Sequence, residues 1–327
     1  MILIHTTGTI EGCPFFMHSI QISCNLAEQY REVSSAGVPA WPASRETLQA
    51  MKQILTAIDF SPESTRSLEF SIGLANRTGA GLTLIWVDHQ TDRESIYENV
   101  KNELRNQARD QFEELVEQYR KKIHSGRIYY KLRKGKIYQE VAQQARLCEA
   151  DIIVAGTHGV SGYEEGWIGS NAYRIVSHSP CPVITVRHDA DAERRIDSIV
   201  IPIDSTLETL HKVPFTLQFA REVEAVVHIA AMMTVSTKSV RTKIEGYARK
   251  AAGEARKSGV ETVISAIETD NIVKGLLDYT TNVGAQLISI MTEQGNAGSN
   301  IIGPFARQVV NDAPVPVLSI QPGLFTM

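Results

Sequence analysis

From Met51 onward, short apolar runs alternate with stretches whose apolar positions recur at helical spacing. The runs are rich in Ile, Val and Leu, which is typical of strands covered on both faces of a sheet. The predicted strands of the first half are 53–58, 82–87, 127–133, 151–156 and 183–187. One predicted helix begins after Ser61, and three more cover residues 93–123, 137–148 and 170–177. This alternation predicts an α/β fold with a doubly wound parallel sheet.

The same order of elements occurs twice in the chain. DSIVIPID (197–204) matches KQILTAID (52–59), and IGPFARQVVNDAPVPVLSI (302–320) matches IGSNAYRIVSHSPCPVITV (168–186) in register. Repeats of this length predict two whole domains rather than small solenoid units. The further elements predicted in the second half are strands at 225–233, 261–267 and 285–291 and helices at 207–221, 236–258 and 271–283.

The domain boundaries follow from these repeats. We predict a first repeat at 51–190 and a second repeat at 196–322, joined by a polar linker at about 188–196. Residues 1–50 contain several Gly and Pro residues and no sustained period. We therefore predict that they form a loosely ordered extension that carries no site.

Composition narrows the range of partners. The formal net charge is -4, which provides no overall basic footprint for nucleic acid. No apolar run approaches the roughly 20 residues of a membrane helix, and the first residues lack the basic region of a signal peptide. The cysteines are scattered without metal-ligand spacing, which is typical of reduced thiols. We expect a cytoplasmic protein without a nucleic-acid or membrane partner.

The clearest candidate site lies in residues 154–171. A strand ends in Gly156, a loop with a second glycine at Gly159 follows, and Gly169-Ser170 opens the next helix. Glycines let the backbone approach a ligand, and the free N–H groups and dipole of a helix start favour an anion. This predicts a phosphate site, most simply for a nucleotide. The alternative is that the glycines only form turns and that Ser170 is an N-cap.

Two further candidates stand at strand ends, where ligands of open parallel sheets bind. Asp59 ends the first strand, and its carboxylate is suited to a sugar, a base or a metal; the alternative is a helix cap, since Asp204 recurs at the same position. Val87 ends the second strand, and its backbone groups are suited to an adenine edge; the alternative is plain core. His158 either lines the phosphate site or is an exposed loop residue, and we assign it no catalytic role.

These residues resemble the universal stress protein family. The resemblance rests on Gly156-x2-Gly159-x9-Gly169-Ser170 between a strand and a helix, on Asp59, and on the segments AIDFSPES and SPCPVITVR. It covers about 51–322 as two tandem copies. It implies a five-stranded, Rossmann-like parallel sheet of the adenine-nucleotide alpha-hydrolase type in each repeat, and ATP, with or without Mg²⁺, at the loop.

The resemblance also implies a role for each matching residue. Asp59 and the Val87 backbone would contact the adenosine, Gly156 and Gly159 the ribose and phosphates, and Gly169, Ser170 and Asn171 the phosphates. Family usage further implies that the last strands, 182–187 and 315–320, associate, either within one chain or between two chains of a homodimer. An exposed edge strand needs such a partner.

The second repeat departs from this pattern. Met291 and Gln294 stand in place of the two loop glycines, and Pro304 and Phe305 stand in place of Ser170 and Asn171. Proline has neither an N–H nor a hydroxyl to offer a phosphate. We therefore predict that the second repeat does not bind ATP in the family manner.

Three functions follow from these observations. The first is a nucleotide-binding regulatory module of the stress response, without enzymatic activity. The second is a slow ATPase or another adenine-nucleotide enzyme, although the chain lacks the G-x-x-x-x-G-K-[ST] loop and the SGGxDS-type loop of ATP pyrophosphatase relatives. The third is a scaffold that binds no nucleotide. The first is preferred to the enzyme because no lysine or arginine is evident in the loop for phosphoryl transfer. It is preferred to the scaffold because Gly156, Gly159 and Gly169 converge with a helix start on one place.

Overall fold

The structure is a computed structural model, and it describes most of the chain from Met51 onward. The described residues are 51–89, 98–124, 127–157, 169–187, 189–191, 194–234, 237–292 and 302–322. The predicted extension, residues 1–50, lies outside them.

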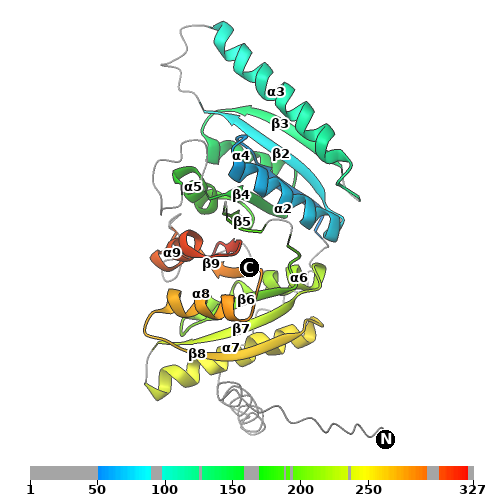
Figure 1. The fold of residues 1–327 in the computed structure, drawn as a ribbon. Helices are drawn as coiled ribbons and strands as arrows, with labels where there is room; N and C mark the ends of the chain where they lie inside the picture. The colour runs from blue at the N-terminus through cyan, green and yellow to red at the C-terminus, as the bar shows by residue number, and fades with distance from the viewer. Residues whose placement is uncertain are drawn as a thin grey trace, which may run out of the picture. The chain divides into compact units, whose positions relative to one another are not determined.

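Strands and helices alternate throughout this part of the chain (Figure 1), which confirms the predicted α/β class. The elements of the first repeat are β1 (Gln53–Ala57), α2 (Pro62–Thr78), β2 (Gly81–Asp88), α3 (Glu98–Arg120), β3 (Ile128–Lys134), α4 (Ile137–Leu147), β4 (Ile152–Gly156), α5 (Ser170–His178) and β5 (Val183–Val186). Those of the second are β6 (Ser198–Ile203), the 3₁₀ turn η1 (Leu207–Leu210), α6 (Val213–Glu222), β7 (Val226–Met233), α7 (Lys238–Lys257), β8 (Thr262–Glu268), α8 (Ile272–Asn282), β9 (Leu287–Met291), α9 (Pro304–Asp312) and β10 (Val317–Ile320).

One 10-stranded sheet runs through both repeats, in the order β3-β2-β1-β4-β5-β10-β9-β6-β7-β8. Strands within each repeat are parallel. The two sets meet where β10 pairs antiparallel with β5, with Leu318 opposite Ile184. The last strands therefore pair within one chain in this structure. In each repeat the strand order reverses beside the first strand, between β1 and β4 and between β6 and β9, and this is where open sheets bind ligands.

Local signals explain the helix boundaries. Ser61 caps α2 by accepting a hydrogen bond from the Ser64 N–H at 3.2 Å, and Gly79 ends the helix with φ 77°. The predicted continuous helix over 207–221 is wrong, because the chain forms η1 and then starts α6 anew. Pro214 lies in the first turn of α6, where no intrahelical acceptor is available for an N–H in any case. In the middle of a continuous helix it would remove a backbone hydrogen bond and break the helix.

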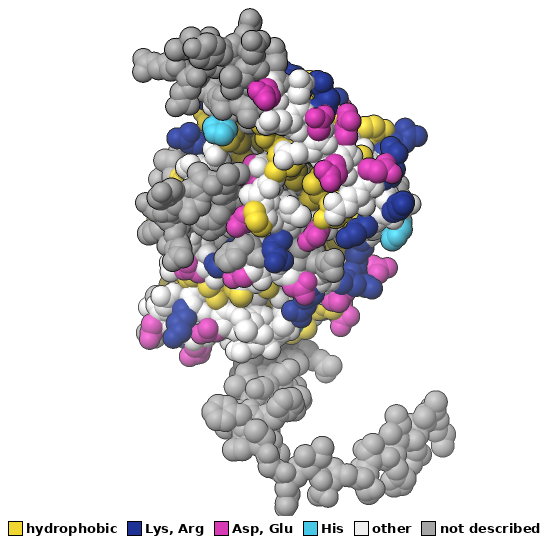
Figure 2. Space-filling model, turned by 45° about the horizontal axis from the view of Figure 1, so that its top comes forward, with side chains coloured by type: hydrophobic (Ala, Val, Ile, Leu, Met, Phe, Trp, Pro, Cys, Tyr) yellow, Lys and Arg dark blue, Asp and Glu magenta, His cyan; other side chains and the backbone are white. Residues whose placement is uncertain are grey.

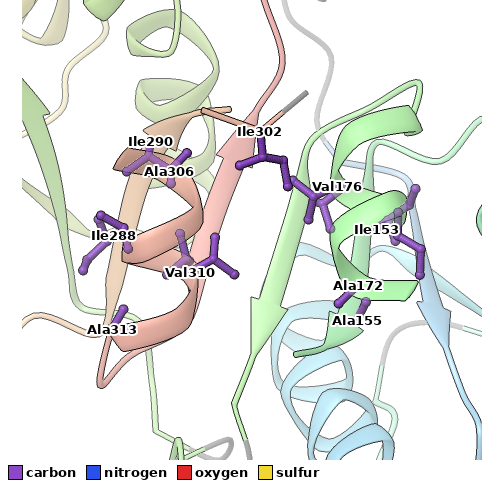
Figure 3. Packing of buried hydrophobic residues seen from close by; sticks show 14 of the residues in the cluster. Ile153, Ala155, Ala172, Val176, Ile288, Ile290, Ile302, Ala306, Val310 and Ala313 are labelled. Atoms are coloured by element: carbon purple, nitrogen blue, oxygen red, sulfur yellow. The ribbon is translucent and has the colours of Figure 1, made fainter. Parts of the chain in front are cut away.

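The core on one face of the sheet is continuous across the two repeats. Buried side chains of β4, α5, β9 and α9 belong to one cluster, and in Figure 3 Ile302 and Val176 point towards one another across the β5–β10 junction. Burial of this apolar surface stabilises the junction at roughly 25 cal/mol per Å².

Polar contacts also tie the repeats together. The Met51 N–H donates to Glu222 Oε2 at 3.0 Å, and Arg77 of α2 lies 3.6 Å from Asp197 and 3.7 Å from Glu224. Gln321 donates to the Val176 carbonyl across the junction. These contacts join the two repeats into one compact structural unit.

Candidate functional site

A cavity of about 440 Å³ opens at the carboxyl ends of β1, β2 and β4. Its mixed lining includes the start of α5, so a glycine-flanked helix N-terminus faces the same space as two strand-end carboxylates. The lining residues described are Ala57, Ile58, Asp59, Ser64, Ile85, Trp86, Val87, Asp88, His89, Ile137, Val141, Ala155, Gly156, Thr157, Gly169, Ser170, Asn171, Ala172 and Ile175. A volume of this size suits a small organic ligand.

Backbone geometry aims Val87 into the cavity. The Ile85 carbonyl accepts from the Ile58 N–H on the β1 side, and the Asp88 carbonyl accepts from the Gly135 N–H on the β3 side, both at 2.9 Å. Because backbone groups of successive strand residues point to alternate neighbours, the N–H and C=O of Val87 point to the β1 side. Since β1 ends at Ala57, opposite Ile85, these groups face the cavity instead of a strand.

Asp59 is held in a tight turn before α2. Its Oδ1 accepts from the Ser61 N–H at 3.1 Å and from the Ser61 hydroxyl at 2.5 Å. Phe60 between them has φ 61°, a left-handed conformation that is uncommon for a bulky residue and is found at functional sites more often than elsewhere. Ser61 rather than Asp59 is the helix cap, so the alternative interpretation of Asp59 as a cap is wrong.

The start of α5 is arranged to receive an anion. The Gly169 N–H donates to the Thr157 carbonyl at 2.8 Å, and the Tyr173 N–H donates to the Gly169 carbonyl at 3.0 Å. Gly169 has no side chain that could cap the helix. The N–H groups of Ser170, Asn171 and Ala172 therefore lack an intrahelical acceptor, and all three residues line the cavity.

The charges around the cavity are acidic. Among the described lining residues there is no lysine or arginine, while the carboxylates of Asp59 and Asp88 are present. Arg174, one turn into α5, lies over the Tyr138 ring at 5.7 Å from its centroid and is not part of the lining. The helix start is thus the anion-attracting element among these residues.

The structure brings the predicted residues Asp59, Val87, Gly156, Gly169, Ser170 and Asn171 to one cavity, and their role in binding stays a prediction. Gly159 and His158 lie outside the described residues. Several lining residues were not among the residues predicted from the sequence. A usable signal existed for two of them: Asp88 directly follows a predicted strand, and Thr157 recurs in the second repeat as Thr292.

The second repeat reproduces the scaffold of this site. The Thr292 N–H donates to the Ile320 carbonyl, the Gly303 N–H to the Thr292 carbonyl, and the Arg307 N–H to the Gly303 carbonyl, at 2.9, 2.7 and 2.9 Å. These bonds match those of Thr157, Gly169 and Tyr173 in the first repeat. On this scaffold, however, Pro304 opens α9, and the Met291 side chain is 2% exposed.

A buried cation lies near Asp204 of the second repeat. Lys212 is 1% exposed, and its Nζ donates to the Thr209 carbonyl at 2.9 Å and to the Thr209 hydroxyl at 3.0 Å. Burial lowers its pKa to about 8, and the Asp204 carboxylate only partly opposes this shift. Counted from Asp59 and Asp204, Lys212 replaces Ser67 of α2. Lys212 was not among the residues predicted from the sequence.

Two classes of feature are absent from the described residues. None of the helices there is both long enough and apolar enough to span a membrane. Within the same ranges, no group of three or more His, Cys, Asp or Glu residues is placed to hold a metal ion.

Comparison with known proteins identifies the family. The profile of the universal stress protein family matches residues 51–187 and again 195–321, so this chain belongs to that family and carries two copies of its domain. A Staphylococcus aureus (strain USA300) protein described as a universal stress protein is 31% identical over 144 residues, which are 42% of this chain and 84% of the relative.

Solved structures share the tandem fold. A universal stress protein from Archaeoglobus fulgidus DSM 4304 matches with a TM-score of 0.68 at 18% identity, over 83% of this chain and 98% of that one. A functionally unknown protein from Pseudomonas aeruginosa PAO1 matches with a TM-score of 0.54 at 15% identity, over 84% and 93%. At these identities the likeness concerns the fold alone.

Proposed function

We propose that the first repeat binds an adenine nucleotide, best represented by ATP, and that the protein is a nucleotide-binding regulatory module of the stress response. The observation that carries this proposal is the meeting of two features in one cavity. The strand-end groups of Asp59 and Val87 suit a nucleoside, and the uncapped first turn of α5 suits phosphates.

In this proposal the ligand lies across the switch point of the sheet. The adenosine contacts Asp59 and the backbone of Val87, whose polar groups have no β1 residue opposite them. The phosphates lie against Gly156 and the N–H groups of Ser170 and Asn171. Mg²⁺ that enters with the nucleotide would offset the charge of the phosphates.

The same cavity argues for binding rather than turnover. Phosphoryl transfer depends on positioning and on neutralising developing charge, usually with lysine, arginine and a metal. The described lining offers no lysine or arginine, and Arg174 packs on Tyr138 instead. Hydrolysis by this protein would therefore be slow, and the bound nucleotide would act as a regulatory ligand.

The second repeat has a structural or partner-binding role in this proposal. Pro304 removes an N–H from the helix start of α9. Met291 has a buried side chain at the position that corresponds to Gly156, which has no side chain. The second repeat supports the first through the shared sheet, in which β10 pairs with β5.

The test is the nucleotide content of the purified full chain. The protein is isolated without added nucleotide and denatured, and the released small molecules are identified and counted by mass spectrometry. About one ATP per chain is expected. Two per chain would contradict the assignment of the second repeat, and none, with no thermal shift on adding ATP and Mg²⁺, would favour the scaffold function.

A matched pair of variants locates the site. Gly156→Val places a side chain in ligand space and should abolish the ATP-induced thermal shift while the protein stays folded. Met291→Val, at the equivalent position of the second repeat, should leave that shift unchanged. Normal ATP binding by Gly156→Val would show that the cavity has been assigned to the wrong ligand.

A further inference from the structure

The two ends of the sheet carry opposite charges. The β3 edge, residues 127–136, contains five basic residues and no acidic one: Arg127, Lys131, Arg133, Lys134 and Lys136. The β8 edge, residues 258–273, contains Glu261, Glu268 and Asp270 and no Lys or Arg. On the face drawn in Figure 2, by contrast, basic and acidic side chains are mixed. The two edges therefore carry local charge runs of opposite sign, although Glu268 already pairs with Arg241 of α7 at 2.5 Å within its own chain.

Both strands end the sheet. Among the described strands β3 pairs only with β2 and β8 only with β7, so no described strand covers the outer side of either one. Tyr129 on the β3 edge is 50% exposed, and Val263 and Ile264 on the β8 edge are 42% and 37% exposed. The lysines of β3 disfavour its pairing with an edge of like charge, whereas β8 has no Lys, Pro or Gly within Thr262–Glu268 that would protect it from pairing.

The directions of the strands allow the two edges to pair. Because β5 and β10 are antiparallel and each repeat is internally parallel, β3 and β8 run in opposite directions within one chain. A second copy displaced along the sheet brings its β3 beside β8 in antiparallel orientation. This is the same kind of contact that joins the repeats at β5 and β10.

The charges agree with that orientation at both ends. If Lys131 lies opposite Ala266, one residue past the centre of β8, then Arg127 lies directly opposite Asp270. At the other end Lys136 lies directly opposite Glu261. Pairing β3 with β3 or β8 with β8 would instead bring like charges together, which is unfavourable between neighbouring strands.

We propose that copies of this chain associate head to tail, with β3 of one copy extending the sheet at β8 of the next. Such a contact joins two different surfaces, so it leaves a free β3 at one end and a free β8 at the other and permits open chains of copies. The partner is a second copy of this chain, selected by opposite charge along a shared antiparallel strand pair.

The first experiment is sedimentation velocity of the full chain over a range of concentrations. The weight-average sedimentation coefficient should rise with concentration at about 0.1 M salt and fall back towards the monomer value at about 1 M salt, because the Debye length shrinks from about 10 to about 3 Å. A single species at every concentration and salt would overturn the proposal.

Charge reversal then tests which edges meet. The β3-edge variant is Arg127→Glu/Lys136→Glu, and the β8-edge variant is Glu261→Lys/Asp270→Lys; all four side chains are exposed and flank the strands. Each variant alone should lose concentration-dependent association. An equimolar mixture should regain association. At the facing positions both edges of the β3-edge variant are acidic and both edges of the β8-edge variant are basic, so every contact between the two variants joins opposite charges.

Controls separate this contact from general charge effects. Arg66→Glu/Arg221→Glu, with exposed residues on α2 and α6, makes the same change in net charge as the β3-edge variant and should associate like the unchanged chain. Loss of association in this control, or failure of the mixture to recover it, would overturn the proposal. The proposal would also be overturned if the chain stayed monomeric and its β3 edge bound single-stranded RNA, as measured by fluorescence anisotropy.

Discussion

The two repeats share a scaffold and differ at the position where a ligand would lie. Thr157 and Gly169 in the first repeat make the same backbone hydrogen bonds as Thr292 and Gly303 in the second. Asp59 and Asp204 likewise both accept from a hydroxyl and an N–H two residues later. The framework of the fold is thus independent of the ligand site built on it.

The two repeats differ in the residues that stand at the positions of that site. The first repeat presents Gly156 and an open helix start to a cavity, whereas the second presents buried Met291 and a proline, with buried Lys212 nearby. Gly156 lines the cavity of the first repeat, whereas the corresponding Met291 of the second repeat has a buried side chain. Substitutions at paired positions should therefore affect binding in the first repeat and stability in the second.

The largest effect on stability is expected from Met291→Ala. Truncating a fully buried methionine removes packing and leaves a cavity, at a cost of about 2–5 kcal/mol. Gly156→Ala, the paired change in the first repeat, should cost less than about 1 kcal/mol but should reduce the ATP-induced thermal shift. Urea unfolding and thermal shift with ATP give both quantities. Equal losses of stability at the two positions would contradict the contrast between a filled and an open site.

The next effect is a gain of stability from Lys212→Met. Burial lowers the pKa of Lys212 to about 8 from 10.5, so the protonated amine disfavours the folded state by about 3 kcal/mol. Methionine keeps most of the volume without the charge. At neutral pH the variant should be more stable in urea unfolding by about 2–3 kcal/mol, a value in which the attraction to Asp204 is already included.

The pH dependence gives this prediction its control. Because the folded pKa lies below the unfolded one, the cost is complete below pH 8 and disappears as pH rises from 8 to 10.5. The stability difference between the unchanged chain and Lys212→Met should therefore shrink over that interval. A difference that stays constant with pH would mean that the pKa of the amine does not change on folding.

A smaller effect, on affinity, is expected from Ser170→Pro. Proline fits the first turn of a helix, as Pro304 shows in α9, so the fold should tolerate it. The change removes one N–H and one hydroxyl from the proposed phosphate site, which costs about 1.5–3 kcal/mol, or about ten- to a hundredfold in Kd. Isothermal titration with ATP measures this loss. Pro304→Ser should add no second binding event, because Met291 still fills the adjacent space.

The sequence alone predicted the elements well and the second repeat's interior poorly. Continuous apolar runs such as the one before Gly156 place β4 to within a residue, because a strand buried on both faces tolerates few polar residues. Lys212 could not be singled out, since one lysine in a helical pattern normally faces solvent and only tertiary packing buries it. The orientation of Val87 depends on β1 ending opposite Ile85, and this register is not encoded locally.

The smallest effect distinguishes two capping turns that look alike. Ser61 and Thr206 both donate to the preceding aspartate, but only Ser61 also accepts from a helix N–H, that of Ser64 at 3.2 Å. Ser61→Ala should therefore cost about 1 kcal/mol in urea unfolding, and Thr206→Ala about half of that, because the second change leaves no helix donor unsatisfied. Ser61→Ala should also weaken ATP binding, since Asp59 loses the hydroxyl that orients it. An unchanged affinity would mean that the Ser61 N–H alone holds the carboxylate, whereas equal stability losses would show that the cap of α2 contributes nothing.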